Sequence, residues 1–251
     1  MLAEECIFSN NTARNSGGAV YDFGSVYSKP CTFINCRLWG NSAAGQGGGG
    51  AVRLNNSEAD LTNCLFYSNT ASYHHTTGGA SGGAINVTIT NYSCITLNNV
   101  TIYGNYAHYQ GGVYVNSNNY SIIMNSLLWY NTSTDTPGPN RQIKFYGGGG
   151  VILYNTSIEG WADEYGGYGN DGNDPLFVDP DGADDVYGTE DDNLRLSSDS
   201  PAINSDTNNE GASQDIYDID EDGDTTEFTP DLDGNERLQG SCIDKGAYEY
   251  Y

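Results

Sequence analysis

Basic residues are scarce in this sequence, and long apolar runs are absent. Lysine and arginine number 9 among 251 residues, against 33 aspartates and glutamates, so the formal net charge is −24. Such a surface repels the phosphates of nucleic acids and anionic lipids. No apolar stretch has the length that crosses a bilayer. We therefore expect no nucleic-acid partner and no insertion into a membrane.

Helical periodicity is also absent, because no apolar stripe recurs at helical spacing. Residues 86–90 and 97–102 alternate as half-buried strands do. Residues 1–5 are acidic and lead directly into a repeat, so we expect no signal peptide. We also expect that the open N-terminal end either continues into upstream coils or stacks on another chain.

What is present is an internal repeat. A small or thiol residue is followed five positions later by an asparagine and then by a glycine pair. The copies start at Cys6, Cys36, Cys64, Val100 and Ser126, at intervals of 30, 28, 36 and 26 residues. Their asparagines are Asn11, Asn41, Asn69, Asn105 and Asn131. A period in this range indicates a repeat architecture.

Each copy has room for two or three short strands, which predicts one coil of a right-handed parallel β-helix. Successive coils would stack about 4.8 Å apart, the spacing of hydrogen-bonded strands. We predict an all-β solenoid of about six coils over residues 1–160 and an irregular acidic cap over residues 161–251. The glycine pairs and asparagines would occupy corners where φ is positive.

In such a stack the cysteines at equivalent positions lie one above another. We expect Cys6, Cys36 and Cys64 to face inward as a buried ladder of small residues rather than to form disulfides. Cys31 and Cys94 would be similarly structural, and a bridge between Cys31 and Cys36 is an open alternative.

The excess negative charge lies in the last third of the chain. Residues 159–251 contain 27 acidic and 3 basic residues, whereas residues 1–158 contain 6 of each. A segment this acidic is often disordered. Apolar residues interrupt it at 176–178, 194–196, 201–203 and 246–248, which favours a tail that folds back on the coils.

One segment of the tail has the pattern of a calcium-binding loop. Residues 218–223 read DIDEDG, and alternating carboxylates with a turn glycine are how a short loop surrounds calcium. The candidate ligands are Asp218, Asp220, Asp222, Asp224 and Glu227. A second acidic cluster comprises Asp179, Asp181, Asp184, Asp185, Asp191 and Asp192, and a weaker third comprises Asp231, Asp233 and Asn235. We predict calcium as the cofactor; the alternative is a solvated acidic turn without metal.

The corner loops of the coils could form a ridge that binds a ligand. They carry Arg14, Tyr73, His74, His75, His108 and Tyr109. Aromatic and histidine side chains in a row could bind sugars, or the histidines could hold a metal. The alternative is that corner loops simply tolerate any polar residue.

The glycine-pair coils resemble the repeats of polymorphic outer-membrane proteins and of other pectin-lyase-like right-handed β-helices. The tail resembles the C-terminal region of bacterial surface proteins of the choice-of-anchor Q type, through residues 174–179, 188–196, 200–203, 231–235 and 244–249. This resemblance implies an extracellular or bacterial cell-surface protein and implies no reaction. We predict a structural or adhesive role, with a glycan or another copy of the chain as partner.

Cleavage of acidic polysaccharides is the alternative function, because many β-helix proteins are lyases or hydrolases. A lyase would need Arg14, His74, His75 or His108 as its base. A hydrolase would need two carboxylates converging on one face. The acidic residues of the coils, among them Glu58 and Asp60, fall at unrelated positions of the repeat. The sequence therefore favours binding over catalysis.

Overall fold

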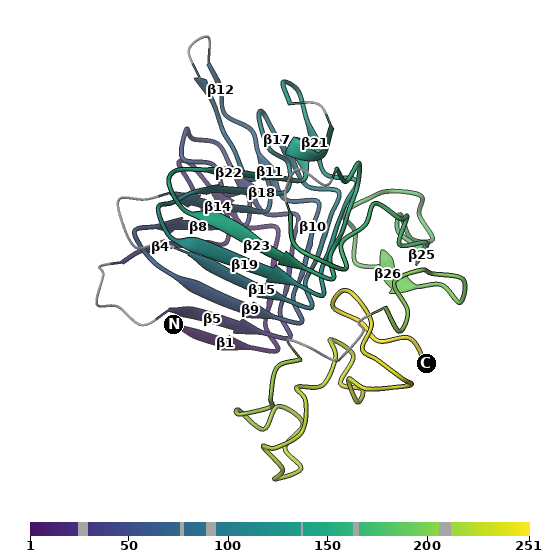
Figure 1. Ribbon diagram of the computed structural model, residues 1–251. Coiled ribbons are helices and arrows are strands. Elements are labelled where there is room, and N and C mark those ends of the chain that lie inside the picture. Colours follow the sequence, from purple (N-terminus) through teal and green to yellow (C-terminus); the bar gives the residue numbers. More distant parts are fainter. Residues whose placement is uncertain (25–29, 76–77, 89–93, 137, 163–165, 206–211) are drawn as a thin grey trace.

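The computed structural model describes residues 1–24, 30–75, 78–88, 94–136, 138–162, 166–205 and 212–251. The chain winds into a parallel β-helix with four long sheets (Figure 1). Each strand pairs in parallel with the strand at the same position of the next coil. Two sheets have six strands and two have five. The predicted all-β parallel β-helix is confirmed, with five complete coils and half of a sixth.

Each coil contributes in chain order to sheets A, B, C and D. Sheet A contains β1 (Leu2–Glu4), β5 (Cys31–Ile34), β9 (Ala59–Thr62), β15 (Ile95–Asn98), β19 (Tyr120–Met124) and β23 (Gly150–Tyr154). Sheet B contains β2 (Ile7–Ser9), β6 (Arg37–Trp39), β10 (Leu65–Tyr67), β16 (Thr101–Tyr103), β20 (Leu127–Trp129) and β24 (Ser157–Ile158). Sheet C contains β3 (Thr12–Ala13), β7 (Ser42–Ala43), β11 (Thr70–Ala71), β17 (Tyr106–Ala107) and β21 (Thr132–Ser133). Sheet D contains β4 (Val20–Phe23), β8 (Val52–Asn55), β14 (Ile85–Thr88), β18 (Val113–Asn116) and β22 (Ile143–Tyr146).

Few elements lie outside these sheets. A small hairpin of β12 (His74–His75) and β13 (Gly78–Gly79) projects from the third coil, at the top of Figure 1. The tail contains one antiparallel pair, β25 (Phe177–Asp179) and β26 (Asn193–Leu196). Helix is limited, among the described residues, to the 3-10 turn η1 (Gly138–Arg141). That part of the chain contains no helix of the length and apolar character needed to cross a bilayer.

The predicted cysteine ladder is confirmed. Cys36 and Cys64 are fully buried and stack in the interior with Val100, and Cys6 packs against the same cluster at the first coil. All the cysteines are free thiols, so the alternative bridge between Cys31 and Cys36 is not formed. The buried thiols of Cys36 and Cys64 each donate to a backbone carbonyl two residues earlier, as Cys64 Sγ does to Thr62 O at 3.2 Å. Burial raises the pKa of the Cys64 thiol, which keeps it protonated.

The asparagines of the repeats form a second ladder, which is buried from Asn41 to Asn131, and the prediction that they adopt positive φ is wrong. Asn69 Nδ2 donates to Asn105 Oδ1 at 2.9 Å, and Asn105 Nδ2 donates to Asn131 Oδ1 at 2.9 Å. The ladder ends at Gln142, whose Oε1 accepts from Asn131 at 2.6 Å. Positive φ belongs to the residue before the asparagine, namely Asn10, Gly40, Ser68, Gly104 and Tyr130. The ladder satisfies amide groups that have no access to water.

The two glycines of a pair are needed for different reasons. Gly49 has a φ of 71°, a conformation that side chains disfavour. Gly50 has an ordinary φ, but a Cβ there would lie 2.1 Å from the carbonyl oxygen of Gly83 in the next coil. The first glycine makes the corner in the pairs that begin at Gly17, Gly49 and Gly82, and the second lets two backbones approach each other.

The tail, residues 161–251, folds back along the outer face of sheet B (Figure 1, green to yellow). The side chains of Tyr67 and Tyr103 on that face are buried in one apolar cluster with Leu194, Leu232 and Tyr248 of the tail. Bridges from Tyr168 and Asp171 also place part of the tail on the edge of the last coil. The acidic tail, expected to form a cap, thus mainly covers one side of the stack, the outer face of sheet B. The outer-facing Leu65, Thr101 and Leu127 of sheet B are buried under this cover, whereas Ile7 of β2 stays 61% exposed.

Candidate functional site

The outer face of sheet D carries polar and aromatic side chains in two rows. Strand pairing aligns Tyr21, Arg53, Asn86, Tyr114 and Lys144 in one row. The second row consists of Phe23, Asn55, Thr88, Asn116 and Tyr146. Between these rows lie inward-facing residues such as Leu54 and Val87, which are fully buried in the core. The alternation fixes which side chains face solvent, because successive strand residues point to opposite faces.

A groove of about 600 Å³ crosses this face from the second coil to the fifth. Its floor is formed by Arg53, Asn86, Tyr114 and Lys144 of sheet D. Its wall is formed by the corner loops that lead into the sheet, with Gln46, Ser81, Tyr109, Gln110, Asp135, Thr136 and Asn140. The groove therefore has a β-sheet floor and a loop wall, and every coil from the second to the fifth contributes to it.

The guanidinium of Arg53 is held firmly in the groove floor. It donates to the carbonyl of Gly47 and to the side chains of Asn86 and Thr88. Asn86 in turn donates to Ser81 O at 2.7 Å. Partial burial lowers the pKa of Arg53, with Tyr21 and Tyr114 acting in the opposite sense. None of these partners is a carboxylate, so the arrangement orients the charge without neutralising it.

Lys144 and two tyrosines occupy the far end of the groove. Lys144 Nζ donates to Asn140 Oδ1 at 3.0 Å and lies 5.6 Å from the ring centre of Tyr146. The rings of Tyr114 and Tyr146 are 5.8 Å apart and tilted by 49°. Tyr146 leaves 54% of its surface exposed, so its ring is available to a ligand. Burial raises the pKa of Tyr114, which stays a neutral phenol.

The charges of the groove differ from those of the rest of the molecule. Across the described residues, five basic side chains pair with carboxylates: Arg37, Arg141, Arg195, Arg237 and Lys245. Arg14, Arg53 and Lys144 have no carboxylate within ion-pair distance in that part of the chain. Arg53 and Lys144 both line the groove, and Arg14 lines the neighbouring depression. In a protein of net charge −24, the unpaired cations of the described residues thus line two adjoining depressions.

The predicted loop ridge is partly brought together. Tyr109 lines the groove, and Arg14 and Tyr73 line a second depression of about 430 Å³. The two depressions share Gln46, whose Nε2 donates to the hydroxyl of Tyr73 at 3.2 Å. His74 and His75 form β12 on the projecting hairpin, but their side chains lie outside the described residues.

His108 serves as a support rather than as an exposed ligand. Its ring is buried, its Nδ1 shares a hydrogen bond of 2.7 Å with Thr134 Oγ1, and its Nε2 is 3.3 Å from Asp135. The ring centre also lies 4.6 Å from that of Tyr109. His108 therefore positions two groove residues, and it does not present a free nitrogen to the groove.

The acidic loop of residues 215–228 brings carboxylates to two common points. Asp218, Asp220 and Asp222 have carboxylate oxygens within 4.8 Å of one another, and so do Asp215, Asp220 and Glu227. Asp215 is a member that the sequence pattern did not include. Asp224, which the pattern did include, instead accepts hydrogen bonds from the backbone and hydroxyl of Thr226.

The other two acidic clusters use their carboxylates differently. Asp191 accepts from the backbone N of Ala183 at 2.8 Å, and Asp192 accepts from that of Gly188 at 2.6 Å. Two carboxylate triads occur among the described residues, and neither includes a member of the second predicted cluster, which comprises Asp179, Asp181, Asp184, Asp185, Asp191 and Asp192. In the third cluster, Asp231 caps its own turn, and Asp233 pairs with Arg37 and Arg195. These carboxylates stabilise turns and hold the tail in place.

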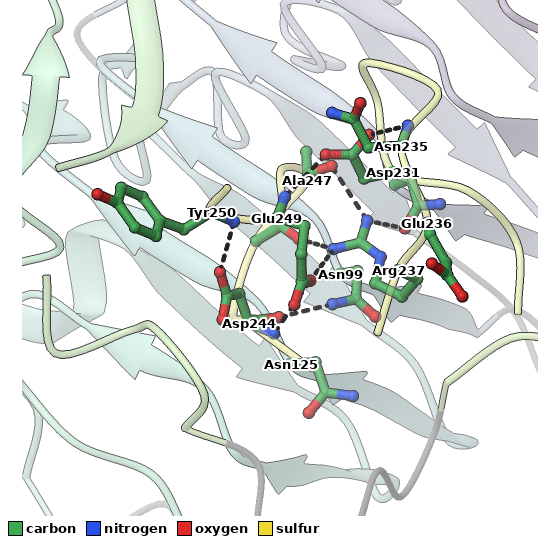
Figure 2. Close-up of polar contacts among 12 residues, drawn as sticks. Asn99, Asn125, Asp231, Asn235, Glu236, Arg237, Asp244, Ala247, Glu249 and Tyr250 are labelled. Atoms are coloured by element: carbon green, nitrogen blue, oxygen red, sulfur yellow. Dashed lines mark hydrogen bonds and ion pairs between the residues drawn. The ribbon is translucent and has the colours of Figure 1, made fainter. Parts of the chain in front are cut away.

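A buried polar cluster fastens the tail to sheet B (Figure 2). Arg237 donates to Asn63 Oδ1 at 2.6 Å and to Ala247 O at 3.1 Å, and it lies 3.5 Å from Glu249. Asn99 Nδ2 donates to Asp244 O at 2.9 Å. Burial, followed by the charge of Asp244, raises the pKa of Glu249 to about 8. The residues of the closing motif thus form an internal joint that is closed to solvent.

Asparagines at the corner between sheets A and B receive this cluster. Asn35, Asn63, Asn99, Asn125 and Asn155 all have positive φ. Asn35 donates to Asp231 O at 3.1 Å, and Gly246 N donates to Asn125 O at 2.8 Å. This outer row of asparagines is separate from the buried ladder, and it explains how one regular surface binds an irregular tail.

Sequence reasoning missed Arg53, Lys144, Asp215 and Arg237. The repeat contains a signal for Arg53 and Lys144. Arg53 follows Val52, an inward-facing residue just after the glycine pair of the second coil, and Lys144 follows Ile143, the equivalent residue of the fifth coil. Aligning the repeats one residue further would have placed Arg53 and Lys144 on the same outer row. Asp215 and Arg237 stand outside any repeat, so only the fold brings them to their partners.

Comparison with known proteins gives one match. The family model of the Chlamydia polymorphic membrane protein repeat matches residues 5–22. This stretch contains the first copy of the motif, from Cys6 through Asn11 to the first glycine pair. No curated protein and no solved structure matches the chain. The match supports a surface-type β-helix protein, while likeness to pectin lyases and to the choice-of-anchor Q proteins stays a prediction.

Proposed function

We propose that this is a surface or outer-membrane-associated β-helix protein that binds an acidic polysaccharide in the groove on sheet D, in an adhesive role. The repeat match at residues 5–22 supports the location, because the matching family is one of membrane proteins. The groove supports the ligand class. Its position on a regular, rigid sheet suits a binding surface that need not move.

The observation that carries the proposal is the segregation of unpaired cations. Arg53 and Lys144 line a single groove, whereas the acidic residues that give the net charge of −24 lie almost entirely in the tail. A positively charged strip attracts a polyanion, and the acidic remainder of the molecule repels it elsewhere. The ligand would therefore be directed to sheet D.

Three features favour a polysaccharide over a small anion. The charged groups are spread over coils two to five, which suits an extended polymer better than one compact ligand. The aromatic side chains of Tyr114 and Tyr146 offer apolar faces with polar tips. The amides of Gln46, Gln110 and Asn140 supply hydrogen-bonding groups for hydroxyls.

The groove favours binding over cleavage. Asp135 is the one carboxylate among the described residues that line it, whereas a hydrolase needs two that converge. His108, a candidate base of a lyase, is buried and hydrogen-bonded to Thr134. Lyase action on a uronate remains the alternative, and the ultraviolet absorbance of unsaturated products would reveal it in the same experiment.

The test is affinity for charged and neutral polysaccharides. We expect polygalacturonate or alginate to bind and uncharged dextran not to bind, with affinity that decreases as salt increases. Lys144→Gln should weaken binding about tenfold, equivalent to about 1.4 kcal/mol. Arg141→Gln is the matched control, since Arg141 is paired with Glu159 and does not line the groove, and it should change affinity less than twofold.

Equal binding of dextran, or equal effects of the two variants, would contradict the proposal. Binding to a second copy of this chain is the other predicted partner, and it is separable by sedimentation in the absence of polysaccharide. Association that survives Lys144→Gln would assign the contact to a surface other than the groove.

A further inference from the structure

We propose that the acidic loop of residues 215–228 binds one calcium ion through a buried ligand, Asp215, and that the ion clamps the tail to the coils. This inference is independent of the polysaccharide groove. The calcium site is the one that the alternating carboxylates predicted, but its innermost ligand and its connection to the solenoid come only from the structure.

The buried ligand is the observation that distinguishes this loop from an ordinary acidic turn. Asp215 is 1% exposed, and its Oδ1 has no hydrogen-bond partner among the described residues. In that same part of the chain the Oε1 atom of Glu227 is also buried without a partner. Asp215 and Glu227 belong to the same triad with Asp220. Burying a charged oxygen without a partner is costly unless a cation is present.

The geometry suits calcium. Two oxygens bound to one calcium ion at about 2.4 Å can be no more than about 4.8 Å apart. Each triad meets that limit within itself, and the two triads share Asp220, so the ion is assigned to Asp215, Asp220 and Glu227, with Asp218 and Asp222 of the second triad beside it. Among the described residues no lysine or arginine pairs with these five carboxylates. Several carboxylates with flexible spacing favour calcium over magnesium, which demands a stricter octahedron and keeps its waters.

The loop is connected to the solenoid through the leg that precedes Asp215, and its second leg is bound to the first. Before Asp215, the hydroxyl of Ser213 accepts from Asn98 Nδ2 at 2.8 Å and lies 3.4 Å from Thr62 Oγ1. After Glu227, Thr229 N donates to Ser213 O at 2.8 Å. Asp215 N also donates to Glu227 O at 3.0 Å, so the two legs of the loop lie side by side.

Calcium would hold these two legs together at their base. The first leg rests on β9 and β15 of sheet A, because Ser213 contacts Thr62 and Asn98. An ion that binds Asp215 from the first leg and Glu227 from the second therefore stabilises the contact between tail and coils, and not the loop alone. Loss of the ion would leave five carboxylates in mutual repulsion at this contact.

The experiment is calcium titration of the full chain after removal of metal with a chelator. We expect the melting temperature to rise with calcium and to saturate, with a smaller rise for equal magnesium. Asp215→Asn should raise the calcium concentration at the midpoint by at least about tenfold, the loss expected for a missing charged ligand. Asp224→Asn, in the same loop, should raise it less than about threefold, because Asp224 bonds to Thr226.

Hydrogen exchange then tests the clamp. Calcium should slow exchange in residues 59–63 and 95–98 of the coils as well as in residues 215–228. Protection confined to the loop would overturn the clamp, and a melting temperature unchanged by calcium would overturn the site. Equal effects of Asp215→Asn and Asp224→Asn would remove the role of the buried ligand. Should Asp215→Asn fail to fold, Asp220→Asn at an exposed position must give the same loss.

Discussion

The outer faces of sheets B and D are built from the same kind of repeat, yet one is covered and the other is open. Both carry aromatic residues, with Trp39, Tyr67 and Tyr103 in one row on sheet B and with Tyr114 and Tyr146 in the two rows of sheet D. The tail packs on sheet B, whereas a groove lies over sheet D. Aromatic residues alone therefore do not decide whether a face becomes an internal contact or a binding surface.

The residues beside the aromatics make the difference. On sheet B the neighbouring outer row contributes Leu65 and Leu127, and burying such side chains stabilises by about 25 cal/mol per Å² of apolar surface. On sheet D the neighbours are Arg53, Asn86 and Lys144, which would lose hydration under a protein cover. The apolar face attracts the tail, and the polar face keeps its contact with water or with a polar ligand.

Charge sharpens the same contrast. Two cations at the covered face, Arg37 of sheet B and Arg195 of the tail, are neutralised because both pair with Asp233 of the tail. The cations of the groove on sheet D have no such partner among the described residues. The tail thus neutralises the charges of Arg37 and Arg195, whereas those of Arg53 and Lys144 stay available to an external ligand.

The largest effect should come from removing the buried cation that fastens the tail. Arg237→Ala should lower the free energy of unfolding by about 3–5 kcal/mol, because it leaves buried carboxylates and Asn63 without their partner. Urea denaturation measures the change. The control Arg141→Ala breaks a half-exposed pair and should cost less than about 1 kcal/mol. Similar losses from both would mean that the tail is not held by this joint.

Truncating one tyrosine on each face tests the comparison directly. Tyr103→Ala should cost about 3 kcal/mol, since its ring is buried between the coils and the tail. Tyr146→Ala should cost about 0.5 kcal/mol or less, because the ring is mostly exposed. Thermal or urea unfolding of the two variants gives the ratio. Equal costs would show that the two faces do not differ in cover.

Lowering the pH should raise the free energy of unfolding through Glu249, which lies in the contact between the tail and the coils. Its pKa is about 8 in the folded protein and near the ordinary 4.5 when unfolded, so the folded state retains a proton that the unfolded chain releases between those values. Stability from this group is complete below about pH 4.5 and is lost as pH rises toward 8. Urea unfolding at pH 5, 6.5 and 8 follows this decline, expected to be about 3 kcal/mol.

A glutamine in place of Glu249 isolates the contribution of that side chain to the pH dependence. Glu249→Gln should flatten the decline, whereas Glu236→Gln at an exposed position should leave it unchanged. A variant with the same slope as the parent would assign the pH dependence to other carboxylates, such as Asp215 or Asp244, whose pKa values burial also raises.

The solenoid could be predicted because its signals are local and repeated. The spacing of Cys36, Asn41 and the glycine pair sets the length of a coil, and it recurs often enough to fix the register of the stack. The same regularity contains the outer row of Arg53 and Lys144, one residue beyond the motif that defines the repeat. Of the predicted loop residues, Tyr109 lines the groove wall and Arg14 lines the neighbouring depression.

The tail could be predicted only in outline. Its apolar segments indicated that it folds back, and residues 218–224 indicated a calcium loop, but no period relates it to the coils. Which carboxylates converge, and which cap turns, depends on contacts across the whole chain. Arg237 reaches Asn63, and the leg beside Asp215 reaches Asn98, over separations that no spacing rule connects.

The sequence by itself determined the coil, its ladders and the acidity of the tail, because each follows from a repeated local pattern or from composition. Only the tertiary structure decided where the tail lies, which cations stay unpaired and which aspartate is buried in the acidic loop. Those outcomes depend on the free energy of covering the outer face of sheet B compared with that of sheet D. Neither face exists until the strands have stacked.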